Sequence, residues 1–255
     1  MSEGLGRLQL HEEELTHGRK QRGVFLLVPW MLIGTLWLRL NTGLDQGVVD
    51  FYIALLQAGA LALVLGMVFE PKFGRDLTSL KLLPFVLLFL LLFVGIFIVF
   101  ATISYATNGD IMINKVNGTE FANFLGLTIL IVAPVETLVF QYVIPKLATL
   151  QLRSMDESTP KGFRLSVFGG MLSQLTFGGF HYVAYNHDVG SMLMAVALGI
   201  GFYALVRLSP VWGLGAAMGA HAGWNVAVSV FNVQALQDIL FGALAAMQTI
   251  VSGVI

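Results

Sequence analysis

Residues 122–145 read ANFLGLTILIVAPVETLVFQYVIP, a run in which Glu136 is the only charged residue. About 20 apolar residues suffice for a helix to cross the roughly 30 Å hydrocarbon core of a bilayer. Similar runs occupy 24–40, 48–69, 82–104, 164–185, 189–207, 210–231 and 236–253. They are continuously apolar rather than alternating, which favours helices over membrane strands. The sequence therefore predicts an all-α polytopic membrane protein with about eight transmembrane helices.

The composition agrees with a membrane location. The 255 residues are 56% hydrophobic and only 11% charged, whereas soluble domains carry about 25% charged residues. The chain has no cysteine, so disulfides and thiolate metal sites are excluded. A net charge of −1 argues against a nucleic-acid partner. We expect a multi-pass protein of the cell membrane, or of an endoplasmic-reticulum type of membrane in a eukaryote, with lipid as its surroundings.

The positions of the basic residues predict an orientation. With a cytoplasmic N-terminus, all of the 14 Lys and Arg residues except Arg39 and Lys115 fall on the cytoplasmic side. Such a bias is the rule for loops that stay inside. We therefore expect both termini to be cytoplasmic. Residues 1–23 form a polar cytoplasmic leader, and residues 24–255 a single transmembrane domain.

Three ionisable side chains lie well inside the predicted spans: Glu136, His181 and His221. Placing an ionisable group in a bilayer costs a few kcal/mol, so each is a candidate functional residue. Asn225 lies four residues after His221 and projects from the same helix face. Small residues around both allow neighbouring helices to approach closely. Because three different helices each carry one ionisable group, we expect the groups to converge.

Local sequence supports this convergence. Pro134 precedes Glu136, and a proline kinks a helix and opens space beside it. Phe177 lies one turn before His181. On the predicted topology Glu136 lies towards the inner half of the membrane and His181 near the outer end of its span. A later helix start, or a kink near Gly169–Gly170, would bring the two to the same depth.

The order and spacing of these residues resemble the CPBP family of CAAX proteases and bacteriocin-processing enzymes, which includes the Ras-converting endopeptidases. That family carries Glu-Glu-x-x-x-Arg, then Phe-x-x-x-His, then His-x-x-x-Asn or His-x-x-x-Asp on successive core helices. Here the second motif spans 177–181 and the third spans 221–225. The matching core covers about 122–231. The first motif departs from the family, because Thr137 and Gln141 stand at the positions of the second Glu and the Arg.

The resemblance implies an intramembrane glutamic protease that needs no metal or other cofactor. Glu136 would be the general base, and His181 would position the water. His221 and Asn225 would form the oxyanion hole. Phe177 would support the site. The substrate would be a membrane-associated protein or peptide.

The departure in the first motif removes two opposite charges together, so no unpaired charge remains in the membrane. A Glu and an Arg four residues apart suit an ion pair on one helix face. We therefore interpret Thr137 and Gln141 as the neutral replacement of a structural pair, and we expect them on one helix face, within hydrogen-bond reach directly or through water.

Other functions remain open from the sequence. Glu136, His181 and His221 could instead hold a zinc ion and leave a water position, although no HExxH pattern is present. The chain could also be a catalytically inactive scaffold, immunity factor or subunit that binds a partner's transmembrane helix. A transporter or channel is less favoured, because deep charges are too few for a polar path.

Overall fold

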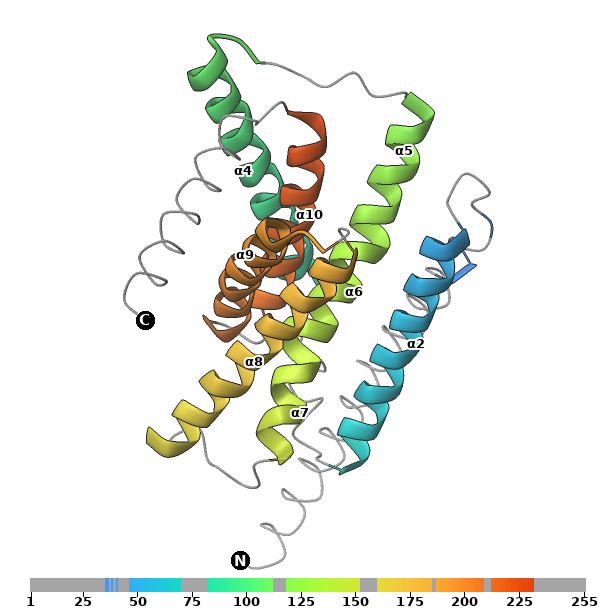
Figure 1. Ribbon diagram of the computed structural model, residues 1–255, viewed down its shortest axis with the longest axis vertical. Helices are drawn as coiled ribbons and strands as arrows, with labels where there is room; N and C mark the ends of the chain where they lie inside the picture. The colour runs from blue at the N-terminus through green and yellow to red at the C-terminus, as the bar shows by residue number, and fades with distance from the viewer. Residues whose placement is uncertain are drawn as a thin grey trace, which may run out of the picture.

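The computed structural model describes residues 46–69, 82–111, 118–151, 160–184, 187–208 and 212–231, together with residues 35, 36, 38 and 40 (Figure 1). All elements of this part are helices: α2 (Gln46–Phe69), α4 (Leu82–Asn108), a composite helix over Gly118–Gln151, α8 (Pro160–Ala184), α9 (Val189–Leu208) and α10 (Gly213–Val230). They match six of the predicted spans, so the all-α class is confirmed here. The leader, nearly all of 24–40 and the span at 236–253 lie outside the described residues.

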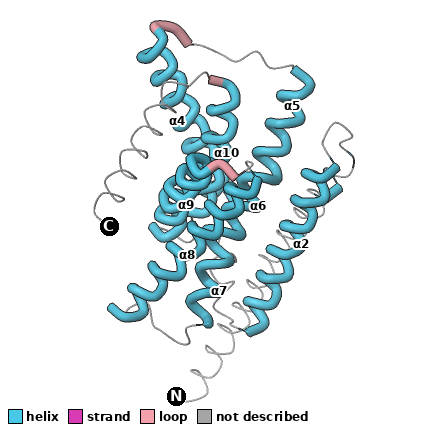
Figure 2. The backbone as a smooth tube through the Cα atoms, viewed as in Figure 1, coloured by secondary structure: helices cyan, strands magenta, loops and turns pink. Residues whose placement is uncertain are grey.

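Three of the described helices are long and apolar enough to cross a membrane. They cover Leu83–Asn108, Phe121–Leu147 and Val189–Leu208. Consecutive helices also run in opposite directions. In Figure 1 α4 ends and α5 begins at the top, whereas α7 ends and α8 begins at the bottom. The tube view in Figure 2 shows that nearly all of the described chain is helical, with only short connections between the helices.

The composite helix changes its winding around Glu136. It consists of α5 (Gly118–Leu127), η1 (Thr128–Val132), α6 (Ala133–Glu136), η2 (Thr137–Val143) and α7 (Ile144–Gln151), and η1 and η2 are π-helical. The Ala133 N–H accordingly bonds to the Thr128 carbonyl five residues before it. Pro134 has no N–H, and its ring would collide with the carbonyl four residues earlier in an α-helix. The helix thus has widened turns on both sides of Pro134, and the kink expected there stays a prediction.

Side chains of α8 hydrogen-bond to η2. The Phe140 carbonyl accepts from Ser173 Oγ and from Gln174 Nε2, and Gln174 Nε2 also donates to the Gly170 carbonyl at 3.1 Å. Because the Gln174 nitrogen faces two carbonyls, its Oε1 is the acceptor for Gln141 Nε2 at 3.0 Å. All these groups are buried, where polar atoms need partners. This polar contact fixes α8 against the composite helix, which is called the central helix below because most of its apolar part is buried.

α10 packs against α4 through glycines. Three glycines spaced four residues apart on α10 face three phenylalanines with the same spacing on α4: Gly215 with Phe85, Gly219 with Phe89, and Gly223 with Phe93. A Cβ atom on Gly219 would overlap the Phe89 backbone. Small residues at such spacing let helix backbones approach closely. This contact sets the position of α10, which carries His221.

Two helix ends have local causes. Gly109 follows α4 with a φ of 73°, and its N–H bonds to the Tyr105 carbonyl at 2.8 Å. This left-handed conformation is the usual glycine stop after a helix. Before α9, Asp188 Oδ2 accepts from the Ser191 N–H at 2.7 Å, a typical N-cap. Hydrogen bonds from the Ser191 hydroxyl and N–H hold the pKa of Asp188 below its usual range.

Candidate functional site

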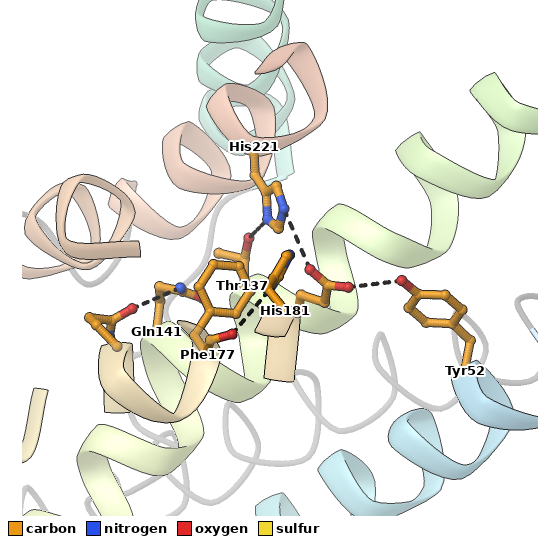
Figure 3. A network of polar contacts seen from close by, with 8 residues as sticks. Tyr52, Thr137, Gln141, Phe177, His181 and His221 are labelled. Atoms are coloured by element: carbon orange, nitrogen blue, oxygen red, sulfur yellow. Dashed lines mark hydrogen bonds and ion pairs between the residues drawn. The ribbon is translucent and has the colours of Figure 1, made fainter. Parts of the chain in front are cut away.

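The carboxylate of Glu136 lies at the centre of a buried polar group. Glu136 ends α6 and is 2% exposed. The Tyr52 hydroxyl, from α2, donates to Glu136 Oε1 at 2.8 Å. Glu136 Oε2 lies 3.6 Å from His221 Nε2 and has no hydrogen-bond partner among the described residues. Figure 3 marks both contacts as dashed lines that start from the labelled Tyr52 and His221. The two carboxylate oxygens therefore have different surroundings.

The imidazole of His221 is buried against residues of three other helical segments, η2, α8 and α9. Its side chain is 3% exposed, and Nδ1 lies 3.1 Å from Thr137 Oγ1. The Phe202 ring stacks on the imidazole with 4.9 Å between centroids, and the Phe177 ring meets it edge-on at 5.9 Å. These contacts fix the plane of the imidazole. Nε2 consequently faces the carboxylate of Glu136.

The contacts of His221 limit which of its nitrogens can carry a proton towards Glu136. A neutral imidazole has one N–H and one acceptor nitrogen. If Thr137 donates to Nδ1, then Nε2 carries the hydrogen that faces Glu136. If Nδ1 donates to Thr137, then Nε2 is an acceptor, and a protonated Glu136 supplies the hydrogen. Both arrangements set a carboxyl group beside an imidazole, 3.6 Å apart, with one titratable proton for the two groups, which suits acid–base chemistry.

His181 lies near the end of α8 and next to the same group. Its Nδ1 is 2.9 Å from the Phe177 carbonyl. A carbonyl only accepts, so in the neutral ring Nδ1 is the donor and Nε2 the acceptor. The Phe177 ring contacts the rings of both His181, at 4.4 Å, and His221, at 5.9 Å. Figure 3 shows His181, Phe177, Thr137 and His221 in one cluster.

The helix that carries His181 differs from the prediction. α8 begins at Pro160, earlier than expected, and continues as a single α-helix to Ala184 through Gly169–Gly170. The late start was therefore wrong, whereas a kink at these glycines stays a prediction. In Figure 1 α8 rises from the end of the molecule where α7 ends. His181, near its C-terminal end, reaches the group through Phe177, whose ring contacts the imidazoles of both His181 and His221.

Asn225 is less closely joined to the group. It lies one turn after His221 on α10 and is half-buried. Its backbone carbonyl accepts from Ser229 Oγ at 2.9 Å. Within the described residues its side chain makes no hydrogen bond. The structure thus brings Glu136 and His221 into contact and His181 beside them, while Asn225 stands one turn away.

Thr137 and Gln141 each bond to a neighbouring helix. Thr137 contacts His221 on α10, and Gln141 contacts Gln174 on α8. The side-chain amide of Gln141 also lies 3.2 Å from the Thr137 carbonyl oxygen, so the two residues are within reach of each other. Thr137 therefore has a direct part in the site: it fixes the orientation of His221.

The sequence analysis did not identify Tyr52. This residue lies in an otherwise apolar stretch, and its partner Glu136 is 84 residues away in the chain. The available signal was weak. A buried tyrosine usually finds a partner for its hydroxyl, so a tyrosine within a predicted span is a candidate neighbour for a buried carboxylate. Ser173 and Gln174 were missed for a similar reason.

A zinc arrangement has no geometric support in the described part of the chain. There, no group of three His, Cys, Asp or Glu side chains lies close enough together to hold a metal ion. What the group can do is exchange a proton between Glu136 and His221, with His181 at hand as an acceptor. That is the chemistry of general acid–base catalysis.

Comparisons with protein-family models, with curated proteins and with solved structures each found no match to this chain.

Proposed function

We propose that the protein is an intramembrane endopeptidase of the CPBP type that hydrolyses a peptide bond of a membrane-associated protein or peptide. The observation that carries this proposal is the contact of Glu136 Oε2 with His221 Nε2 at 3.6 Å, in a buried position without a hydrogen bond to Oε2. Buried polar atoms are nearly always paired. A carboxylate oxygen kept unpaired beside an imidazole is therefore better suited to a reaction than to stability.

The proposed reaction uses a water molecule as nucleophile. Glu136 accepts a proton from the water while the water oxygen attacks the carbonyl carbon of the peptide. His221, as the N–H donor, and Asn225 stabilise the oxyanion that develops. His181 holds the water through its acceptor nitrogen. When the C–N bond breaks, Glu136 returns the proton to the leaving amine, so the site ends in its original protonation state.

We also propose that the chain is a multi-pass integral membrane protein with eight spans and both termini in the cytoplasm. The alternating helix directions and the distribution of basic residues support this topology. Because the chain has no native cysteine, a single introduced cysteine can be labelled without background from other thiols. At Asn108 the thiol should react with an impermeant reagent only from outside, and at Leu208 only from the cytoplasm. Labelling of both from the same side would refute the topology.

A second candidate function is an inactive scaffold or immunity factor that binds a partner's transmembrane helix. The observation that favours it is the replacement of a charged pair by Thr137 and Gln141, both of which are engaged in buried hydrogen bonds between helices. Such contacts hold a helix bundle together whether or not a reaction occurs. The two functions differ in their dependence on the Glu136 carboxylate.

The substitution Glu136→Gln distinguishes a protease from an inactive scaffold. The amide keeps the size and the bond from Tyr52 but cannot act as a base. We expect the purified protein in lipid vesicles to cleave internally quenched peptides that carry a C-terminal lipid anchor. Cleavage should be insensitive to a chelator and at least about 100-fold slower in Glu136→Gln.

The matched control is Asp50→Asn, the same change on the exposed side of α2, which should cleave normally. Equal cleavage by Glu136→Gln and the native protein would refute the glutamic mechanism. Absence of cleavage by the native protein across a broad peptide set would favour the scaffold.

A further inference from the structure

Tyr52 is the only described residue that hydrogen-bonds to the side chain of Glu136. We propose that Tyr52 is a positioning residue of this site: its hydroxyl holds Oε1 so that Oε2 faces His221 and receives the proton. This inference rests on the proposed function, and it adds α2 to the helices that build the site.

A carboxylate needs such a restraint. The terminal torsion of a glutamate is broad and roughly two-fold, so its two oxygens exchange places easily. A hydrogen bond from a neutral donor to a charged oxygen is short and strong. At 2.8 Å, the bond from Tyr52 selects one oxygen as the fixed end. The other oxygen is then presented to His221 in a constant direction.

The packing of α2 shows why the hydroxyl reaches this position. Val49, Ile53 and Leu56 of α2 are buried in the same apolar cluster as Val135 and Val139 of the central helix. Tyr52 is flanked by these residues along α2 and therefore emerges next to Glu136.

The neighbour of Tyr52 extends the contact to α8. Phe51 stacks on Phe180 with 5.1 Å between centroids and 10° between planes, and Phe180 meets His181 edge-on at 5.2 Å. The two neighbours of Tyr52 on α2 thus contact different helices: Phe51 packs on α8, and Ile53 packs on the central helix.

The surroundings of Glu136 determine what the bond does to its charge. The titratable side chains that face it from neighbouring elements are Tyr52 on α2, His221 on α10 and, behind Phe177, His181 on α8. Of these, the Tyr52 hydroxyl is the group that donates to Glu136 in every protonation state of the histidines. A donor favours the ionised form of a carboxylate. Its removal should therefore make Glu136 harder to ionise.

The test compares Tyr52→Phe with Tyr203→Phe. Both remove one tyrosine hydroxyl, and Tyr203 donates to the Ser166 carbonyl at 3.2 Å, outside the Glu136 group. Infrared titration of the full chain in lipid vesicles reads the carboxyl band of Glu136, assigned by its loss in Glu136→Gln. In Tyr52→Phe the pH at which this band converts should rise by about one unit or more. In Tyr203→Phe it should stay in place.

The peptide assay gives an independent reading. With the lipid-anchored quenched peptides, kcat of Tyr52→Phe should fall about tenfold or more while KM changes little, and the acidic limb of the pH–rate profile should move upward. An unchanged infrared titration in a folded Tyr52→Phe protein would overturn the inference. If the titration shifts in Tyr52→Phe but the native protein cleaves no peptide, the restraint on Glu136 stands and the proposed protease function is refuted.

A second variant covers the case in which Tyr52→Phe does not fold. Fluorotyrosine introduced at position 52 alone keeps the ring and the hydroxyl and makes the phenol a stronger donor. The Glu136 band should then convert at lower pH, opposite to the effect of removing the hydroxyl. A shift in the same direction, or none, would overturn the inference.

Discussion

The membrane-spanning parts of α4 and of the composite helix are of nearly equal length, 26 and 27 residues, but they occupy opposite environments. Only 6% of the apolar window of Leu83–Asn108 is buried inside the structure, against 78% for Phe121–Leu147. Over residues 83–99 the exposed side chains of α4 are all leucine, valine or isoleucine, including Leu83, Leu87, Leu91, Val94 and Ile98. The buried helix carries Thr128, Glu136, Thr137 and Gln141.

The difference shows how apolar and polar side chains are divided between the periphery and the centre of the described helices. In water, the most apolar helix would occupy the core. In the proposed membrane setting lipid solvates apolar side chains as well as protein does, so helices associate through close packing and polar contacts instead. The most apolar helix can then lie at the periphery, held by one glycine-lined contact. The polar helix lies at the centre, where its side chains find partners.

The largest effect should come from breaking the glycine contact that holds α4. Gly219→Ala places a Cβ atom against the backbone at Phe89, and backbone cannot move aside as a side chain can. We expect a loss of about 1–3 kcal/mol in the free energy of unfolding, measured by denaturation in detergent micelles. Gly95→Ala on α4 is the control, because nothing lies within 4 Å of the new Cβ. Equal effects of the two substitutions would show that α4 is not held by this contact.

A smaller effect should separate buried from exposed hydroxyl groups. Thr137→Val keeps the shape of the side chain but leaves His221 Nδ1 without its partner, which should cost about 1–2 kcal/mol. Thr102→Val makes the same change on α4, where an exposed hydroxyl bonds to the Ile98 carbonyl of its own helix. That substitution should change stability by less than about 0.5 kcal/mol. If the two variants melt alike, Thr137 does not anchor His221.

The smallest effect is expected in an experiment on the native sequence, without any substitution. A photoreactive lipid should form adducts with the outward residues of α4, such as Leu87 and Leu91, because these are exposed. Residues 133–143 should form none, since all of them are buried. Mass spectrometry of peptides from the native protein reads both segments in one sample. Comparable labelling of the two would contradict the separation into a lipid-facing and a central helix.

Apolarity and the rarity of ionisable residues made the main features predictable. Runs of apolar residues predicted the ends of the described helices to within about six residues. Glu136, His181 and His221 stood out because ionisable groups are unfavourable in a bilayer. These signals are local, and they do not depend on how the helices pack.

The features that were missed depend on contacts between helices. Nothing near Tyr52 in the sequence indicates Glu136, and nothing near Thr137 indicates His221. The π turns were also not predictable, since Pro134 is compatible with a kink or with a wider helix. The helix that carries His181 extends further than its apolar run, because polar residues before position 164 continue the same winding.

The positions of these partners in the chain impose an order on synthesis. Tyr52 is made 84 residues before Glu136, whereas His221 follows Thr137 by 84 residues and Gln174 follows Gln141 by 33. At about 5–20 residues per second, a delay of 84 residues lasts roughly 4–17 s. When the central helix leaves the ribosome, its carboxyl group thus has its hydrogen-bond donor ready. The uncharged side chains of Thr137 and Gln141 meet their partners only when later helices have been made.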